Sequence, residues 1–217
     1  MGVITSIEKQ KNNKHRYSIY MDDHYFAALD EEMIVKAHIK TGMDMDEATL
    51  SQWILEDELK KAFEKSLSFL GYRARSGKEI MQYLERKGFD PSVIQKTIEK
   101  LEYYRYINDE DFAKAWVQDR KIGKNVGKMV IRQELTRKGI HRDIAQAALE
   151  DITEEDELER ATQWVQKLVN KKTGAGVDQR MLLQKISQTL FRKGFGWEVI
   201  HKALHKASID LDEDHYE

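Results

Sequence analysis

Leu135-Thr-Arg-Lys-Gly139-Ile140 is one of three copies of a motif, the others being Leu84-Glu-Arg-Lys-Gly88-Phe89 and Leu190-Phe-Arg-Lys-Gly194-Phe195. Each copy has the features of a helix C-terminus, where glycine adopts the left-handed conformation just past the last turn. The leucine has the spacing that brings it into contact with the apolar residue after the glycine. The Arg-Lys pair puts positive charge in the last turn, where it suits the helix dipole. We therefore predict three helix ends of the same design.

The similarity between the copies extends beyond the motif itself. An isoleucine stands eight residues before each glycine, at Ile80, Ile131 and Ile186. Together with the leucine four residues later, it forms a one-sided apolar stripe on a helix. The glycines are 51 and 55 residues apart, which is long enough for three helices in each unit. Periods of this length are typical of helical repeat proteins.

The remaining patterns divide the 217 residues into five segments. Residues 1–45 alternate as strands over 3–29 and then predict a helix from about Asp30 to Ile39, which gives a small three-stranded meander plus helix. Residues 46–207 are expected to be helical, with no strand after residue 30. The boundaries we predict are a linker helix and first repeat over 46–106, a second repeat over 107–152, and a third repeat over 153–207. Residues 208–217 are acidic, have little to bury, and are expected to be disordered.

Composition narrows the functional class. The chain has no cysteine, which excludes disulfides and thiolate chemistry and fits a reducing compartment. No apolar run approaches the length of a membrane span, and the N-terminus lacks the pattern of a signal peptide. One proline among 217 residues favours a mostly helical fold. We expect a cytoplasmic protein, a monomer, without membrane association.

The net charge of −2 conceals strongly charged segments. Residues 120–142 contain eight lysines and arginines against one acid, Glu134, whereas residues 143–159 contain eight acids and no base. A polyanion interacts with the local charge of a surface and not with the net charge of the chain. The basic residues are therefore the candidate residues for binding a polyanion. We expect the following to face a polyanion such as DNA: Arg73, Arg75, Lys87, Lys121, Lys124, Lys128, Arg132, Lys138, Lys171, Lys172, Arg180, Arg192 and Lys193.

A second interpretation of the same residues remains open. Charge runs are routinely solvated helix faces, and cations near helix ends match the dipole. Lys121, Lys124, Lys128 and Arg132 would form one stripe only if that stretch were helical throughout. Tyr103-Tyr104-Arg105-Tyr106 is equally ambiguous, because arginine beside aromatics can stack on bases, but tyrosines also pack hinges between repeats.

No motif predicts catalysis, a cofactor or a metal. Gly123-Lys-Asn-Val-Gly127-Lys128 is similar to a phosphate-binding loop, but its glycine spacing is one residue short and no strand is predicted before it. We interpret it as a turn between helices. His201 and His205 have a spacing that could share a metal, but no third ligand is apparent. We interpret both as surface histidines and expect the protein not to be an enzyme.

At the level of motifs, the chain resembles the RecX family, the bacterial regulators of the RecA recombinase. The similarity rests on Tyr72-Arg-Ala-Arg-Ser76 with Glu79, on Tyr106-Ile-Asn-Asp-Glu-Asp-Phe-Ala113, and on the segment Gly127 to Ile140 with its Glu-Leu and Lys-Gly pairs. It covers roughly residues 58–207. The first 57 residues resemble the extension of longer members, and the third repeat carries looser family features.

The resemblance implies three tandem three-helix units in an elongated, curved array. It also implies binding to the RecA–single-stranded DNA filament and mainly inhibition of its ATPase, growth and strand exchange, within DNA recombination, repair and the SOS response. The family supplies no catalytic residue. Two other functions stay open: a direct DNA-binding module that acts without RecA, on single- or double-stranded DNA, and a protein-only scaffold.

Overall fold

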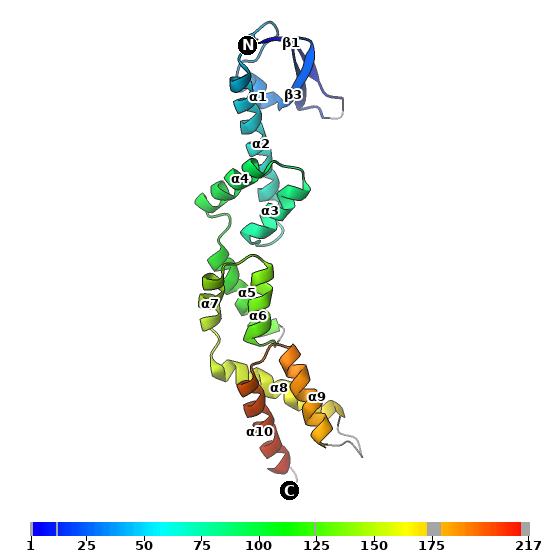
Figure 1. Ribbon diagram of the computed structural model, residues 1–217, viewed down its shortest axis with the longest axis vertical. Coiled ribbons are helices and arrows are strands. Elements are labelled where there is room, and N and C mark those ends of the chain that lie inside the picture. The colour runs from blue at the N-terminus through cyan, green and yellow to red at the C-terminus, as the bar shows by residue number, and fades with distance from the viewer. Residues whose placement is uncertain (1, 12, 124, 173–178, 214–217) are drawn as a thin grey trace. The chain divides into compact units, whose positions relative to one another are not determined.

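The structure is a computed structural model that describes residues 2–11, 13–123, 125–172 and 179–213. Side chains are described for these residues except 172, 179 and 207–213. The chain separates into two compact units (Figure 1). Unit 1 comprises residues 1–74 and 80–106, and unit 2 comprises residues 75–79 and 107–217. The first turn of one helix, residues 75–79, thus packs with the second unit.

Unit 1 begins with a small antiparallel sheet. Its strands are β1 (Gly2–Lys9), β2 (Arg16–Met21), β3 (His24–Asp30) and β4 (Asp44–Met45), in the order β3-β2-β1-β4. Asp22 and Asp23 connect β2 to β3, and both have positive φ, as a two-residue type I′ hairpin turn requires. The three predicted strands are confirmed.

The fourth strand corrects the prediction that no strand follows residue 30. Gly2 pairs with Met45 and Val3 pairs with Asp44, so the segment just before α2 completes the sheet. Met45 is buried in the core of the sheet with Leu50 from the next helix. A two-residue strand carries no period-2 pattern, which is why the sequence did not reveal it.

Helices cover this sheet and continue the chain. Helix α1 (Glu31–Lys36) is shorter than predicted, and α2 (Glu47–Leu70) is one uninterrupted helix from the N-cap residue Asp46. The side chain of Asp46 accepts hydrogen bonds from Ala48 N and Thr49 N, which satisfies two of the free donors of the first turn. Helix α2 thus joins the sheet to the first repeat, whose other helices are α3 (Gly77–Arg86) and α4 (Pro91–Tyr103).

Unit 2 contains the second and third repeats. Repeat 2 consists of α5 (Asp109–Gly123), α6 (Lys128–Arg137) and α7 (Arg142–Glu150). Repeat 3 consists of α8 (Glu154–Lys172), α9 (Gln179–Arg192) and α10 (Trp197–Glu213). Each has its own core, which contains the predicted stripe residues: Ile131 and Leu135 in repeat 2, Ile186 and Leu190 in repeat 3. Three three-helix repeats are therefore present, as predicted.

The three motif copies end helices as predicted. Gly88, Gly139 and Gly194 have φ of +81°, +83° and +87°. In each copy the N–H after the glycine donates to the carbonyl of the motif leucine, for example Ile140 N to Leu135 O at 3.1 Å. This hydrogen bond defines the Schellman cap.

The C-terminus differs from the prediction. Helix α10 extends to Glu213, so residues 208–213 are helical and not disordered. Residues 214–217 lie outside the described residues, as do residues 173–178 of the predicted loop in repeat 3.

Candidate functional site

Two joints hold consecutive parts of unit 2 together, and both use a motif glycine turn. At the first joint, Ser76 caps the start of α3 by accepting from Glu79 N at 3.3 Å. Its hydroxyl also donates to the carbonyl of Lys138 at 2.6 Å, just before Gly139. The N–H of Gly77 donates to Asp109 of α5 at 3.0 Å, and burial raises the pKa of the Asp109 carboxyl above its usual value. The first turn of α3 is therefore fixed to repeat 2.

The second joint repeats this pattern between repeats 2 and 3. Gly127, the residue that precedes α6, donates its N–H to the carbonyl of Lys193 at 2.9 Å, just before Gly194. The next N–H, of Lys128, donates to Glu157 of α8 at 2.8 Å. An acid near the start of one repeat thus caps the second helix of the preceding repeat, at both joints. Gly127, which lies in the segment similar to a phosphate-binding loop, thus contacts the backbone at the end of α9.

In the second and third motif copies, the lysine packs on a tryptophan from the first helix of its own repeat, whereas Lys87 of the first copy lies over Tyr83 of α3. The Lys138 ammonium lies 4.9 Å from the centroid of the Trp116 ring, and that of Lys193 lies 3.7 Å from Trp164. Lys138 also donates to Glu79 at 2.7 Å. The pKa of the Lys193 ammonium is lowered below the usual lysine value, mainly by burial and to a smaller extent by the positive charge of the nearby Lys167. These two lysines have internal partners, which a filament contact would have to share.

The predicted basic residues therefore fall into two groups. Internal partners engage Arg75, through an ion pair with Glu79 at 3.9 Å, and Lys121, through Asp156 at 3.1 Å, in addition to Lys138 and Lys193. The second group is defined by exposure alone: Lys128 is half-buried, and the following are exposed, namely Arg73, Lys87, Arg132, Lys171, Arg180 and Arg192. Lys124 and the side chain of Lys172 lie outside the described residues. That these residues bind a filament stays a prediction.

The predicted stripe over residues 121–132 does not form. Helix α5 ends at Gly123 and α6 begins at Lys128, so Lys121 and Lys128 lie on different helices. Only Lys128 and Arg132 share one helix, four residues apart, and Arg132 donates to Gln146 of α7 at 2.8 Å. The basic surface of repeat 2 is thus centred on α6.

Glu134, the only acid in residues 120–142, lies inside repeat 2. It accepts hydrogen bonds from Trp116 Nε1 at 2.9 Å and from Arg120 Nε at 2.6 Å. The Arg120 guanidinium lies 4.0 Å from the Trp116 ring centroid and is almost wholly buried. Glu134 and Arg120 are therefore structural, and the remaining charge that α6 presents to solvent is positive.

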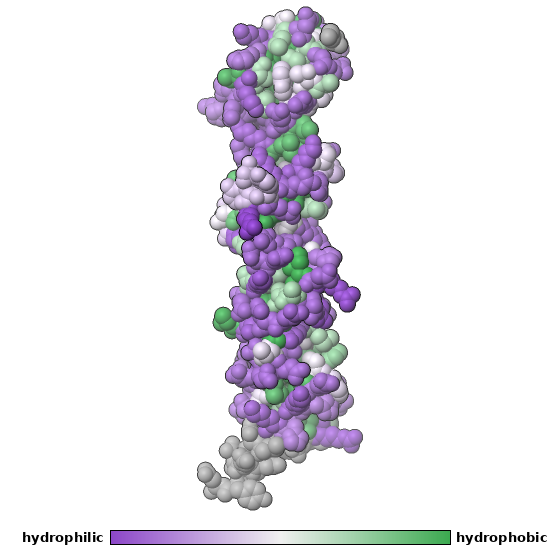
Figure 2. All heavy atoms as spheres, turned by 90° about the vertical axis from the view of Figure 1, so that its left-hand side faces the viewer, coloured by the Kyte–Doolittle hydropathy of each residue, from purple (hydrophilic) through white to green (hydrophobic). Residues whose placement is uncertain are grey.

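Polar and charged residues predominate on the face drawn in Figure 2, where apolar residues appear in small separate groups. One aromatic group in unit 1 is the tyrosine segment. Tyr104 and Tyr106 pack edge-on against Phe63 of α2, with ring centroids 6.3 and 5.9 Å apart. Arg105 has φ of +57°, where the chain turns after α4. Tyr104 and Tyr106 nevertheless stay 56% and 52% exposed, so the structure leaves both interpretations of the segment open.

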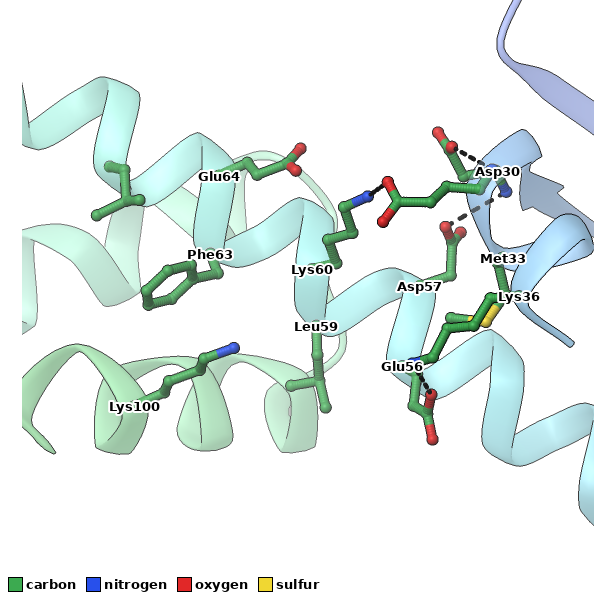
Figure 3. Close-up of a pocket in the computed structure, with 12 residues that line it drawn as sticks. Asp30, Met33, Lys36, Glu56, Asp57, Leu59, Lys60, Phe63, Glu64 and Lys100 are labelled. Carbon is green, nitrogen blue, oxygen red and sulfur yellow. Dashed lines mark hydrogen bonds and ion pairs between the residues drawn. The ribbon is translucent and has the colours of Figure 1, made fainter. Parts of the chain in front are cut away.

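A pocket of about 500 Å³ lies in unit 1 between α1, α2 and α4 (Figure 3). Two ion pairs line it, Lys60 with Glu32, and Lys36 with Glu56 at 3.7 Å. Asp57, buried beside it, accepts from the N–H of Asp30 at 3.3 Å and pairs with Lys61. Lys100 lies 4.5 Å from the centroid of Phe63. Most of the charged side chains that line the pocket thus have partners within unit 1.

A hollow on repeat 3 is the site that the sequence analysis missed. About 640 Å³ in volume, it lies between α9 and the start of α10, and its lining residues are Gln184, Ser187, Gln188, Phe191, Arg192 and Trp197. The signal was present in the sequence as a departure from the repeat. Where repeat 3 has Phe191, the other copies have Glu85 and Thr136; where it has Trp197, they have Pro91 and Arg142.

The described ranges contain neither a candidate metal site nor a candidate membrane span. No group of three or more histidine or acidic side chains there could hold a metal ion, and His201 instead lies with its ring edge-on to Trp197, at 4.9 Å between centroids. No described helix combines the length and apolar character needed to cross a bilayer.

Comparison with protein families gives four consecutive matches. Residues 2–46 match the regulatory protein RecX N-terminal domain, and residues 62–101, 108–149 and 154–204 match the first, second and third three-helix domains of RecX. The matched ranges coincide with the sheet segment and with the three repeats described above.

Individual relatives agree with these matches. The chain is 36% identical over 214 residues to the regulatory protein RecX of Bacillus pumilus (strain SAFR-032), covering 99% of this chain and 81% of the relative. The RecX of Bacillus subtilis (strain 168) is also 36% identical, covering 99% and 80%. A crystal structure of regulatory protein RecX superimposes with a TM-score of 0.70 at 28% identity, covering 93% of this chain and 98% of that one. A structure of RecX from Lactobacillus salivarius gives 0.66 at 28% identity, covering 71% and 99%.

Proposed function

Because the chain belongs to the RecX family, we propose that it binds the RecA–single-stranded DNA filament and mainly inhibits its ATPase and recombination activity. The observation that carries the proposal is the run of four RecX domain matches, which leaves no repeat of the chain unassigned. The relatives are named as regulatory proteins, which agrees with a role other than catalysis.

The joints of unit 2 give a physical reason for this function. Repeats 2 and 3 are connected through backbone hydrogen bonds at Gly127 and Gly194, so the two repeats present their surfaces together. A filament is a regular lattice of protein around a polyanion. Contacts from linked repeats to such a lattice act at high effective concentration, so individually weak contacts produce tight binding.

Direct DNA binding without RecA is the second candidate. Helix α6 carries Lys128, Arg132 and Arg137 on ten residues with Glu134 turned inward, and a basic helix of a three-helix unit can enter a major groove. A protein-only scaffold is the third. Dependence on RecA separates the first function from the other two, and dependence on salt separates DNA binding from the scaffold.

We expect the protein to lower the rate of ATP hydrolysis by RecA on single-stranded DNA. A coupled ATPase assay with and without the protein measures this directly. The Lys128→Glu/Arg132→Glu variant should inhibit more weakly, because it reverses the charge of the exposed face of α6. The Lys65→Glu/Lys96→Glu variant makes the same charge change in unit 1 at exposed lysines and is the matched control. Equal inhibition by both variants would exclude α6 as the contact, and no effect of the wild type would refute the proposal.

Salt dependence gives a second, independent prediction. If about four phosphates of the single strand are neutralised, log affinity should fall with log salt at a slope of roughly −3, a loss of about 50-fold between 50 and 200 mM. Contacts only to acidic protein side chains would show the shallower dependence of screened ion pairs. Fluorescence anisotropy of labelled filaments across this salt range distinguishes the two.

A further inference from the structure

The hollow of repeat 3 exposes two large aromatic side chains that the repeat itself does not need. Trp197 is 60% exposed and Phe191 is 54% exposed, whereas the core of repeat 3 is complete without them. The equivalent positions in the other two repeats carry no aromatic residue, and those repeats form the same fold. Adjacent exposed aromatics are unfavourable in water, so their presence here indicates a binding role.

The surroundings of the hollow restrict the kind of ligand. Helix α9 contains Arg180, Lys185 and Arg192 and no acidic residue, so it favours an anionic partner. Arg192 lines the hollow itself, next to Phe191, and its Nε donates to the carbonyl of Gln188 in its own helix at 3.4 Å. The hollow thus combines aromatic rings with an adjacent cation that is exposed to solvent.

The polar side chains of the hollow add a third element. Gln184 and Gln188 are exposed and line the hollow from α9, and their amide groups can both donate and accept hydrogen bonds. Unpaired nucleobases are recognised in this way, by stacking on aromatic rings and hydrogen bonding at their edges, while a nearby cation contacts the phosphate. The ligand that satisfies all three elements is an anionic chain with flat aromatic groups.

We propose that the hollow between α9 and α10 holds one or more unstacked bases of single-stranded DNA, with Trp197 and Phe191 as stacking surfaces and Arg192 on the backbone phosphate. The proposal rests on the proposed function for the presence of single-stranded DNA at the protein surface. It adds to that function a site that contacts the base. The basic residues of α6, by contrast, would contact only the charged backbone. An apolar side chain of a protein partner is the competing occupant.

The test is a comparison of two strands in the absence of RecA. A fluorescein-labelled dT oligonucleotide and an abasic strand of equal length carry the same number of phosphates, so the electrostatic part of binding is matched. We expect the wild type to bind the dT strand about 5- to 100-fold more tightly than the abasic strand, the range expected for stacking of a single base. Equal affinity for the two strands, or no binding to either, overturns the proposal.

Variants locate the effect. Trp197→Ala and Phe191→Ala should each lose most of the preference for dT while keeping their affinity for the abasic strand, and Trp197→Phe should keep the preference. Met181→Ala removes another exposed apolar side chain from the same helix, outside the hollow, and should behave as the wild type. Circular dichroism confirms that each variant is folded. A Trp197→Ala variant that retains the preference overturns the site.

The outcomes are distinguishable from those of the RecA proposal. Inhibition of the RecA ATPase by a wild type that shows no preference for dT would leave the proposed function standing and remove the base site. Preference for dT without any effect on RecA would support the base site and refute the proposed function.

Discussion

Gly194→Ala is expected to lower the free energy of unfolding of unit 2 by about 2–5 kcal/mol, the sum of left-handed backbone strain and overpacking. Gly194 has φ of +87°, and a side-chain carbon there would lie 2.5 Å from the backbone nitrogen of Val130 at the second joint. A backbone atom cannot rotate away as the tip of a side chain can. The joint must therefore open to admit the methyl group, and urea denaturation measures the loss.

The other two motif glycines make this prediction specific. Gly88 has a similar φ but no atom within 4 Å of the added carbon, so Gly88→Ala should cost only about 1–2 kcal/mol. Gly139 is intermediate, because the carbon would meet the Lys78 side chain at 2.5 Å. Gly123→Ala, at an open position in α5 without positive φ, should be neutral or slightly stabilising. Equal losses at positions 88 and 194 would show that the joint does not constrain the turn.

Glu134→Ala should destabilise repeat 2 by about 3 kcal/mol, because removing one partner of a buried ion pair leaves the buried charge of the other only partly compensated. The Arg120 guanidinium would keep only Asp119, and the indole N–H of Trp116 would lose its acceptor. Glu134→Gln should cost less than Glu134→Ala, since the amide oxygen can still accept from both donors. Thermal unfolding of the two variants beside the wild type measures the difference.

An exposed ion pair in the same unit provides the control. Glu154 and Lys202 lie 3.8 Å apart and are both well exposed, so Glu154→Ala should change the stability by less than about 0.5 kcal/mol. A loss below 1 kcal/mol in Glu134→Ala would mean that Arg120 finds another partner or water, and that the inward-facing acid is dispensable.

The fold of each repeat could be predicted from the sequence because its signals are local. The apolar stripe, the Ser76 capping box, the Asp90-Pro91 start and the glycine caps all act within one or two helical turns. The short strand β4 was missed because two residues carry no periodicity, and its pairing partner lies about forty residues earlier in the chain.

The candidate site was predicted only in part. Charge alone singled out the basic residues, and charge does not distinguish an exposed lysine such as Lys171 from Lys138, which packs on Trp116 and pairs with Glu79. Phe191 and Trp197 stand in the sequence at positions where the three repeats differ. A repeat is recognised from the positions at which its copies agree, so these two residues did not contribute to the prediction.

What the sequence by itself determined is therefore the repeating three-helix unit and the left-handed turn that ends the second helix of each copy. Only the tertiary structure decided that two of these turns form joints with the start of another helix. Ser76 meets the carbonyl of Lys138 across 62 residues, and Gly127 meets Lys193 and Gly194 at the corresponding place in the next repeat. The physical reason is range: helix caps form between residues close in the chain, whereas these joints exist only after separate helices have packed and brought their backbones into contact.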